Sequence, residues 1–173
     1  MTQETNINMK TLVAYFSATG TTEQVAKELA DVTGGTLYEI KPEVRYTDAD
    51  LDWHDRNSRS SVEMMNKNSR PAIINDLKGA DGYDRIFIGF PVWWYTAPTI
   101  INTFIETYGF EGKTVILFAT SGGSTVDKAN KDFAASYPAI NWKPGKTLNG
   151  TSKAAIKVWV EGLTQGNGPF VSD

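Results

Sequence analysis

The sequence contains no cysteine and only one histidine, His54. The missing cysteine excludes disulfides, thiolate nucleophiles, cysteine-ligated zinc and iron–sulfur clusters. The single histidine removes most other metal sites, and every serine–histidine–aspartate mechanism that does not use His54. A redox role would therefore need a bound cofactor, because the side chains supply no redox group of their own.

A strong charge of one sign and long hydrophobic runs are also missing. The 17 Lys and Arg against 20 Asp and Glu leave a net charge of −3, with no basic stripe for nucleic acid. The longest apolar stretch, residues 86–95, is about half as long as a membrane span. Residues 1–10 are polar and lack the apolar centre of a signal peptide. These absences predict a soluble, cytoplasmic protein that binds neither nucleic acid nor membranes.

What is present suits one globular domain. The chain has 173 residues, of which 40% are hydrophobic and 12% aromatic, enough for a sizeable core. We expect a polar N-terminal tail over residues 1–10 and a C-terminal tail over residues 165–173. Between them, residues 11–164 form a single domain with an insertion at about 42–71.

Strand-like and helix-like segments alternate along this domain. Short apolar runs predict strands at 11–16, 36–41, 85–90 and 114–120, and a fifth within 140–148, where Pro144-Gly145 interrupts the pattern. Helical spacing of apolar residues predicts helices at 21–32, 99–108, 125–136 and 152–163. Alternation with short connections predicts an α/β fold: a doubly wound, five-stranded parallel sheet of order 2-1-3-4-5, with helices on both faces.

The insertion, residues 42–71, is the exception to this regular pattern. It is polar and contains a possible helix at 58–68, and its basic side chains include His54, Arg45, Arg56, Arg59 and Arg70. Connections of this length are usually functional or flexible.

Three loops follow predicted strands one, three and four. The first contains Ser17, Thr19, Gly20, Thr21 and Thr22. Its hydroxyls, a glycine bend and the amides of a helix N-terminus could hold an anion such as phosphate, or could simply cap the helix. The nearest cation along the chain is Lys27, so neutral groups would bind the phosphate.

The second loop contains Pro91, Val92, Trp93, Trp94 and Tyr95. Three adjacent aromatic side chains point in different directions, so at least one should be exposed and could stack on a flat ring. The alternative is a hydrophobic plug or a dimer contact. The third loop contains Thr120, Ser121, Gly122 and Gly123, where two glycines allow backbone amides to approach a ligand closely.

In the predicted sheet order these loops meet where ligands of doubly wound folds bind. A phosphate attached to a flat hydrophobic ring system describes FMN. The segment YFSATGTTEQVA resembles the phosphate loop of flavodoxins, and IGFPVWWYTAPTIINTF and GKTVILFATSGGS resemble one flavodoxin-like subgroup. The resemblance covers residues 12–163. It implies noncovalent FMN, with its phosphate on the first loop and its isoalloxazine ring between the second and third.

Two functions follow as hypotheses. The first is an FMN-binding redox protein that transfers electrons between protein or small-molecule partners. The alternative is an FMN-dependent oxidoreductase that takes hydride from NAD(P)H and reduces a quinone-like acceptor, with the arginines and His54 of the insertion binding substrate. One-electron carriers of the resembled family turn a backbone peptide in the second loop. Residues 92–97 contain no glycine, so a positive φ there should cost about 1–2 kcal/mol more, which favours the enzyme.

Overall fold

The computed structural model describes residues 9–121 and 123–164. Its core is a five-stranded sheet in which every neighbouring pair of strands is parallel. In spatial order the strands are β2 (Thr36–Glu39), β1 (Thr11–Tyr15), β3 (Arg85–Pro91), β4 (Thr114–Thr120) and β5 (Asn141–Thr147). The predicted doubly wound α/β fold and its strand order are therefore confirmed.

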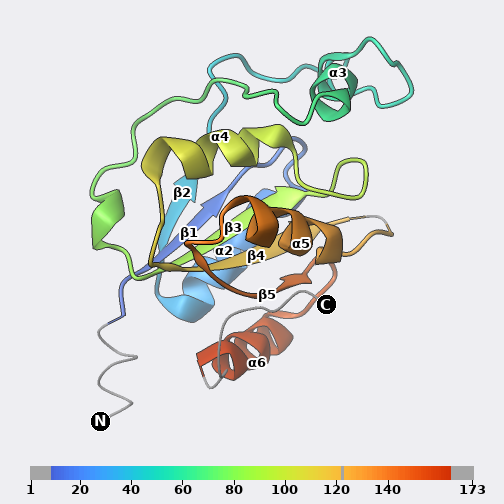
Figure 1. Cartoon of the computed structure of the whole chain (residues 1–173). Helices are drawn as coiled ribbons and strands as arrows, with labels where there is room; N and C mark the ends of the chain where they lie inside the picture. Colours follow the sequence, from blue (N-terminus) through green and yellow to red (C-terminus); the bar gives the residue numbers. More distant parts are fainter. Residues whose placement is uncertain (1–8, 122, 165–173) are drawn as a thin grey trace.

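Helices cover both faces of this sheet (Figure 1). One face packs against α2 (Thr21–Thr33) and α6 (Lys153–Thr164), and the other against α4 (Thr99–Tyr108) and α5 (Asp127–Ser136). Because side chains alternate along a strand, Leu12 joins the core beneath α4, whereas Val13 joins the core beneath α2. Within residues 9–121 and 123–164, no helix combines the length and the apolar character needed to cross a membrane.

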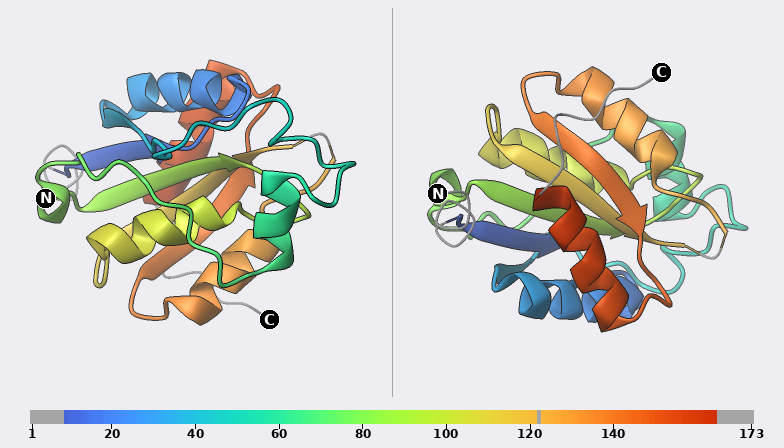
Figure 2. Two further views of the ribbon diagram at one scale, coloured as in Figure 1. Left: turned by 90° about the horizontal axis from the view of Figure 1, so that it is seen from above. Right: turned by 90° about the horizontal axis from the view of Figure 1, so that it is seen from below.

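A short 3₁₀ helix, η1 (Ala80–Gly82), precedes β3, and α3 (Arg59–Met65) lies in the insertion. The α3 helix stands beside the carboxyl ends of the central strands (Figure 2). It is shorter than the predicted 58–68 because Asn66 adopts an extended backbone and its side chain accepts a hydrogen bond from the amide of Asn68 at 3.0 Å. Asparagine side chains often end helices in this way.

The edge strand β5 tolerates Pro144 and Gly145 because its register against β4 shifts between Ile116 and Phe118. At this irregularity the Gly145 amide donates to the side chain of Asn130 at 3.0 Å. A Cβ on Gly145 would lie 2.4 Å from the carbonyl oxygen of Leu117. Pro144-Gly145, which interrupts the strand pattern in the sequence, thus lies at the irregularity in β5.

Candidate cofactor-binding site

The structure brings the three loops together at the carboxyl ends of β1, β3 and β4. The hydroxyls of Thr22 and Thr120 are 2.8 Å apart, and this buried hydrogen bond joins the first loop to the third. The amide of Val92 donates to the carbonyl of Thr120 at 2.9 Å, which joins the second loop to the third. A ligand at this edge of the sheet can therefore contact all three loops.

In the first loop, two of the predicted hydroxyls are used by the fold. The Ser17 hydroxyl oxygen accepts from the amides of Gly20 and Glu23, at 3.0 and 3.2 Å, and so stabilises the start of α2. Thr22 is buried against Thr120. Thr19 and Thr21 are exposed, and their hydroxyls are available to a ligand. Gly20 supplies the predicted bend, with φ 100° in the left-handed region.

The backbone of the same loop offers further donors. In the part of the chain that the structure describes, the amides of Ala18, Thr19, Thr21 and Thr22 donate to no protein acceptor. They lie at the N-terminus of α2, a helix of 13 residues whose dipole favours negative charge at this end. Unpaired amides at a helix N-terminus are a suitable site for phosphate. This loop therefore fits the phosphate of FMN without any cationic side chain.

The aromatic side chains of the second loop divide into two groups. Trp93 packs edge-on against Phe16 and Tyr46, each with ring centroids 5.7 Å apart. Trp94 is 43% exposed and Tyr95 is 72% exposed. The expectation that at least one aromatic side chain is exposed is confirmed. Trp93 fits the plug alternative, whereas Trp94 and Tyr95 leave flat surface for a ligand.

The backbone of this loop is strained. Trp93 and Thr96 exchange two hydrogen bonds of 2.9 and 3.0 Å, and between them Trp94 and Tyr95 have positive φ values of 49° and 70°. Hairpin turns of this kind favour Asn and Gly, so Trp and Tyr carry a cost of about 1–2 kcal/mol each. A positive φ is therefore already present despite the missing glycine. The absence of glycine from residues 92–97 therefore no longer favours an enzyme over an electron carrier.

Glycine at position 95 should relieve part of this strain. We expect Tyr95→Gly to raise the stability of the protein without cofactor by about 1 kcal/mol, a rise in Tm of roughly 2–4 °C, because glycine adopts positive φ freely and Tyr95 is mostly exposed. Thermal melting followed by circular dichroism measures the change. Tyr95→Ala is the matched control, since it removes the same ring but keeps a Cβ in the strained conformation. A rise of equal size in both variants would contradict the explanation.

The third loop is held by a residue that the sequence analysis did not identify. The side-chain oxygen of Asn149 accepts from the amide of Ser121 at 3.0 Å, and its side-chain nitrogen donates to the carbonyl of Ser121 at 2.8 Å. The Ser121 hydroxyl oxygen in turn accepts from the amides of Gly123 and Ser124. Asn149 follows β5, so nothing in its local sequence indicated this contact. Gly122 lies outside the described residues.

A cavity of about 500 Å³ lies between the insertion and the second and third loops, and no residue of the first loop lines it. Its lining residues come from the insertion and from the second and third loops, and none is charged: Leu51, Trp53, Ser60, Met64, Val92, Trp93, Trp94, Tyr95 and Ser124. The size and aromatic lining are typical of small-molecule sites.

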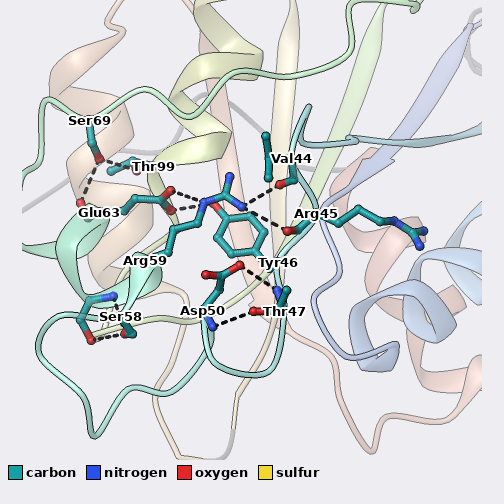
Figure 3. Close-up of polar contacts among 11 residues, drawn as sticks. Val44, Arg45, Tyr46, Thr47, Asp50, Ser58, Arg59, Glu63, Ser69 and Thr99 are labelled. Carbon is teal, nitrogen blue, oxygen red and sulfur yellow. Dashed lines mark hydrogen bonds and ion pairs between the residues drawn. The ribbon is translucent and has the colours of Figure 1, made fainter.

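One polar cluster joins separate segments of the insertion to each other (Figure 3). The guanidinium of Arg59 lies 3.7 Å from the ring centre of Tyr46, donates to the carbonyl of Val44 at 2.7 Å and pairs with Glu63 at 3.1 Å. The Tyr46 hydroxyl donates to Glu63 at 2.6 Å. Burial, together with Glu63, raises the pKa of Tyr46 and so preserves this donor. At its base, an antiparallel bridge between Pro42 and Ile73 closes the insertion.

The basic residues of the insertion do not surround the cavity. Arg59 pairs with Glu63, and Arg70 pairs with Glu106 on α4 at 3.0 Å. His54 is exposed and stacks on Trp53 with ring centroids 3.8 Å apart. Arg59 and Arg70 thus have partners within the protein, and substrate binding by the insertion, which belongs to the alternative function, stays a hypothesis.

The comparisons with known proteins agree with this geometry. The family profile of the flavodoxins matches residues 10–163, and the chain belongs to that family. Among solved structures, a protein of Bacteroides eggerthii classed as a flavoprotein is 51% identical, with a TM-score of 0.88 over 90% of this chain and 98% of the other. One of the same class from Bacteroides uniformis is 57% identical, with a TM-score of 0.86 over 88% and 98%.

A more distant structure is the flavoprotein of Lactobacillus acidophilus, which was solved in complex with FMN. It is 23% identical, with a TM-score of 0.70 over 90% of this chain and 99% of the other, and so supports the fold alone. Among curated proteins, none matches the chain.

Proposed function

We propose that this protein binds FMN noncovalently at the carboxyl edge of its sheet and transfers electrons between redox partners. The observation that carries the proposal is the set of unpaired amides at the N-terminus of α2, on a loop that hydrogen bonds join through Thr120 to the loop of the exposed Trp94. The first feature suits a phosphate and the second a flat ring. Membership of the flavodoxin family and the FMN complex of the Lactobacillus acidophilus protein support the same cofactor.

Each of the three loops has a distinct task in this proposal. The unpaired amides of Ala18, Thr19, Thr21 and Thr22 and the hydroxyls of Thr19 and Thr21 hold the phosphate. Val92, Trp94 and Tyr95 face the ring and exclude water from one side of it. Asn149 fixes the third loop, so that Ser121 and Gly123 keep their positions. The bound flavin supplies the group that accepts and donates electrons. The proposed partners are a redox protein or a small-molecule acceptor.

A second candidate function is an FMN-dependent oxidoreductase that takes hydride from NAD(P)H and reduces a quinone-like acceptor. The specific observation in its favour is the cavity that the insertion forms over the second loop. An electron carrier that delivers to a protein surface has no need for such an enclosure. Anaerobic mixing of the FMN form with NADH or NADPH distinguishes the two functions, because only the enzyme bleaches the flavin directly.

The substitution Trp94→Ala tests whether the protein binds FMN as proposed. We expect Trp94→Ala to weaken FMN binding by about three- to tenfold and to brighten the fluorescence of bound flavin, because a stacked indole quenches flavin and contributes about 0.5–1.5 kcal/mol. Fluorescence titration of the purified protein measures both effects. A wild-type protein that binds no flavin at all would overturn the proposal.

Trp159→Phe is the matched control for this experiment. Trp159 lies on α6 and contacts Phe87 edge-on, with ring centroids 5.9 Å apart, on the face of the sheet that packs against α2. Its replacement should change stability slightly and FMN affinity not at all. An equal loss of FMN affinity in both variants would mean that the Trp94 effect comes from stability and not from contact.

A further inference from the structure

In the proposed function the first loop holds the phosphate of FMN with neutral groups alone. A phosphate monoester carries a charge of about −1.5 to −2 at neutral pH, whereas a helix N-terminus offers only about half a positive charge. Much of the negative charge of the phosphate is therefore left without a partner. A cationic side chain beside this loop would complete the site, because charged hydrogen bonds to phosphate are the stronger ones.

Two cations that belong to elements next to the first loop already have carboxylate partners. Lys27 on α2 pairs with Glu23 at 3.4 Å, and Lys41, which follows β2, pairs with Asp76 at 3.0 Å. Arg45 differs from both. It is exposed, and among the residues that the structure describes its guanidinium forms no ion pair and donates no hydrogen bond. The charge of Arg45 is therefore available to a ligand.

The fold places Arg45 beside the first loop. Its neighbour Tyr46 packs edge-on against Phe16, with ring centroids 5.5 Å apart, and Phe16 immediately precedes Ser17. Arg45, Ser17 and Ala18 line one cavity of about 490 Å³, which shares no lining residue with the cavity between the second loop and the insertion. Ala18 also belongs to the set of unpaired amides at the start of α2. A side chain of the insertion thus shares a cavity with the phosphate loop.

The backbone at Arg45 is held in place while its side chain is free. The Arg59 guanidinium donates to the carbonyls of Val44 and Arg45, at 2.7 and 3.4 Å. Figure 3 shows the Arg45 side chain extending away from this cluster. Two carboxylates, Glu39 and Glu43, line the same cavity. Their negative charges would oppose a phosphate, and the positive charge of Arg45 offsets part of this repulsion.

We propose that Arg45 is a specificity-determining residue that pairs with the phosphate of FMN and so favours FMN over riboflavin. The proposal rests on the proposed function, since it takes FMN as the cofactor. Arginine suits this role because its planar guanidinium can donate two parallel hydrogen bonds to phosphate oxygens. Because Arg45 is exposed, water and salt screen the attraction, so its contribution should be smaller than that of the loop amides.

Paired fluorescence titrations with FMN and riboflavin, at low and high ionic strength, test this role. At an ionic strength of about 0.01 M, we expect Arg45→Gln to lower the ratio of FMN to riboflavin affinity by about three- to fivefold. At about 1 M the ratios of the variant and the wild type should differ by less than about twofold, because salt screens an exposed pair. Arg45→Lys keeps the charge and should retain most of the wild-type ratio.

Arg56→Gln is the matched control, because Arg56 is an exposed arginine of the same insertion that does not line this cavity. We expect its ratio of affinities to equal that of the wild type. An unchanged ratio in Arg45→Gln at low ionic strength would overturn the proposal. So would an equal fall in both variants, which would reflect the net charge of the protein and not the position of Arg45. A wild-type protein that binds no FMN would instead overturn the proposed function.

Discussion

Replacement of Arg59 by Met is expected to loosen the whole insertion while the sheet stays folded. The substitution removes the ion pair with Glu63, the contact with the Tyr46 ring and the hydrogen bond to the Val44 carbonyl. The side chains of Arg59 and Glu63 are only 23% and 13% exposed, so Glu63 keeps a largely buried charge without its cation. Breaking such a pair costs about 2–3 kcal/mol, less than the figure for a fully buried pair.

Amide hydrogen exchange can measure this loss of stability within the insertion alone. Amide hydrogen exchange in the insertion should accelerate by roughly 30- to 100-fold, because exchange there follows local opening, whereas β3 and β4 should be little affected. Arg56→Met is the control, since Arg56 lies in the same insertion and is exposed. Equal acceleration in both variants, or acceleration spread evenly over the sheet, would show that the Arg59 cluster does not hold the insertion together.

The sheet could be predicted from the sequence because its determinants are local. Apolar runs such as residues 85–90 and 114–120 show the buried central strands directly, and β4 has the predicted bounds of 114–120. The helix at 99–108 also has its predicted bounds, with Gly109 as its C-cap. Alternation of these elements with short connections then limits the topology to a doubly wound sheet.

The candidate site was predictable only as a set of loops, and not as individual contacts. The bond between Thr22 and Thr120 joins residues 98 positions apart, and the contact of Asn149 with Ser121 spans 28 positions. Neither distance corresponds to a periodicity that a sequence pattern could reveal. For the same reason the sequence did not show that Arg59 contacts Tyr46 and Glu63.

The backbone conformation of the second loop could not be predicted for a different reason. Local propensity argues against positive φ at Trp and Tyr, yet Trp94 and Tyr95 both adopt it. Thr96 accounts for part of this, because its hydroxyl donates to Asp132 on α5 at 2.9 Å, and the neighbouring Ala97 is buried. Such strain persists when the surrounding structure determines it, and it is concentrated at functional sites. The departure from propensity is thus itself an indication of the site.

The largest effect on the cofactor is expected from Gly20→Val. Gly20 has φ 100°, and its amide donates to Ser17 at the turn into α2. Valine is strained there, so the loop must change its path and the amides of Thr19 and Thr21 must move. Hydrogen bonds to a charged phosphate contribute about 1.5–3 kcal/mol each, so two lost bonds weaken FMN binding by about a hundredfold or more. Riboflavin, which lacks the phosphate, should lose little affinity.

Gly34→Val is the control that distinguishes the loss of phosphate binding in Gly20→Val from the effect of backbone strain. Gly34 lies at the other end of α2 with φ 70°, and, as at Gly20, a Cβ there would meet no atom within 4 Å. Both substitutions should therefore lower the free energy of unfolding by about 1–2 kcal/mol. Only Gly20→Val should lower the ratio of FMN to riboflavin affinity, as measured by paired fluorescence titrations. An unchanged ratio in Gly20→Val would show that the phosphate does not bind at this loop. Strain that displaces no hydrogen-bond donor would weaken FMN and riboflavin binding equally.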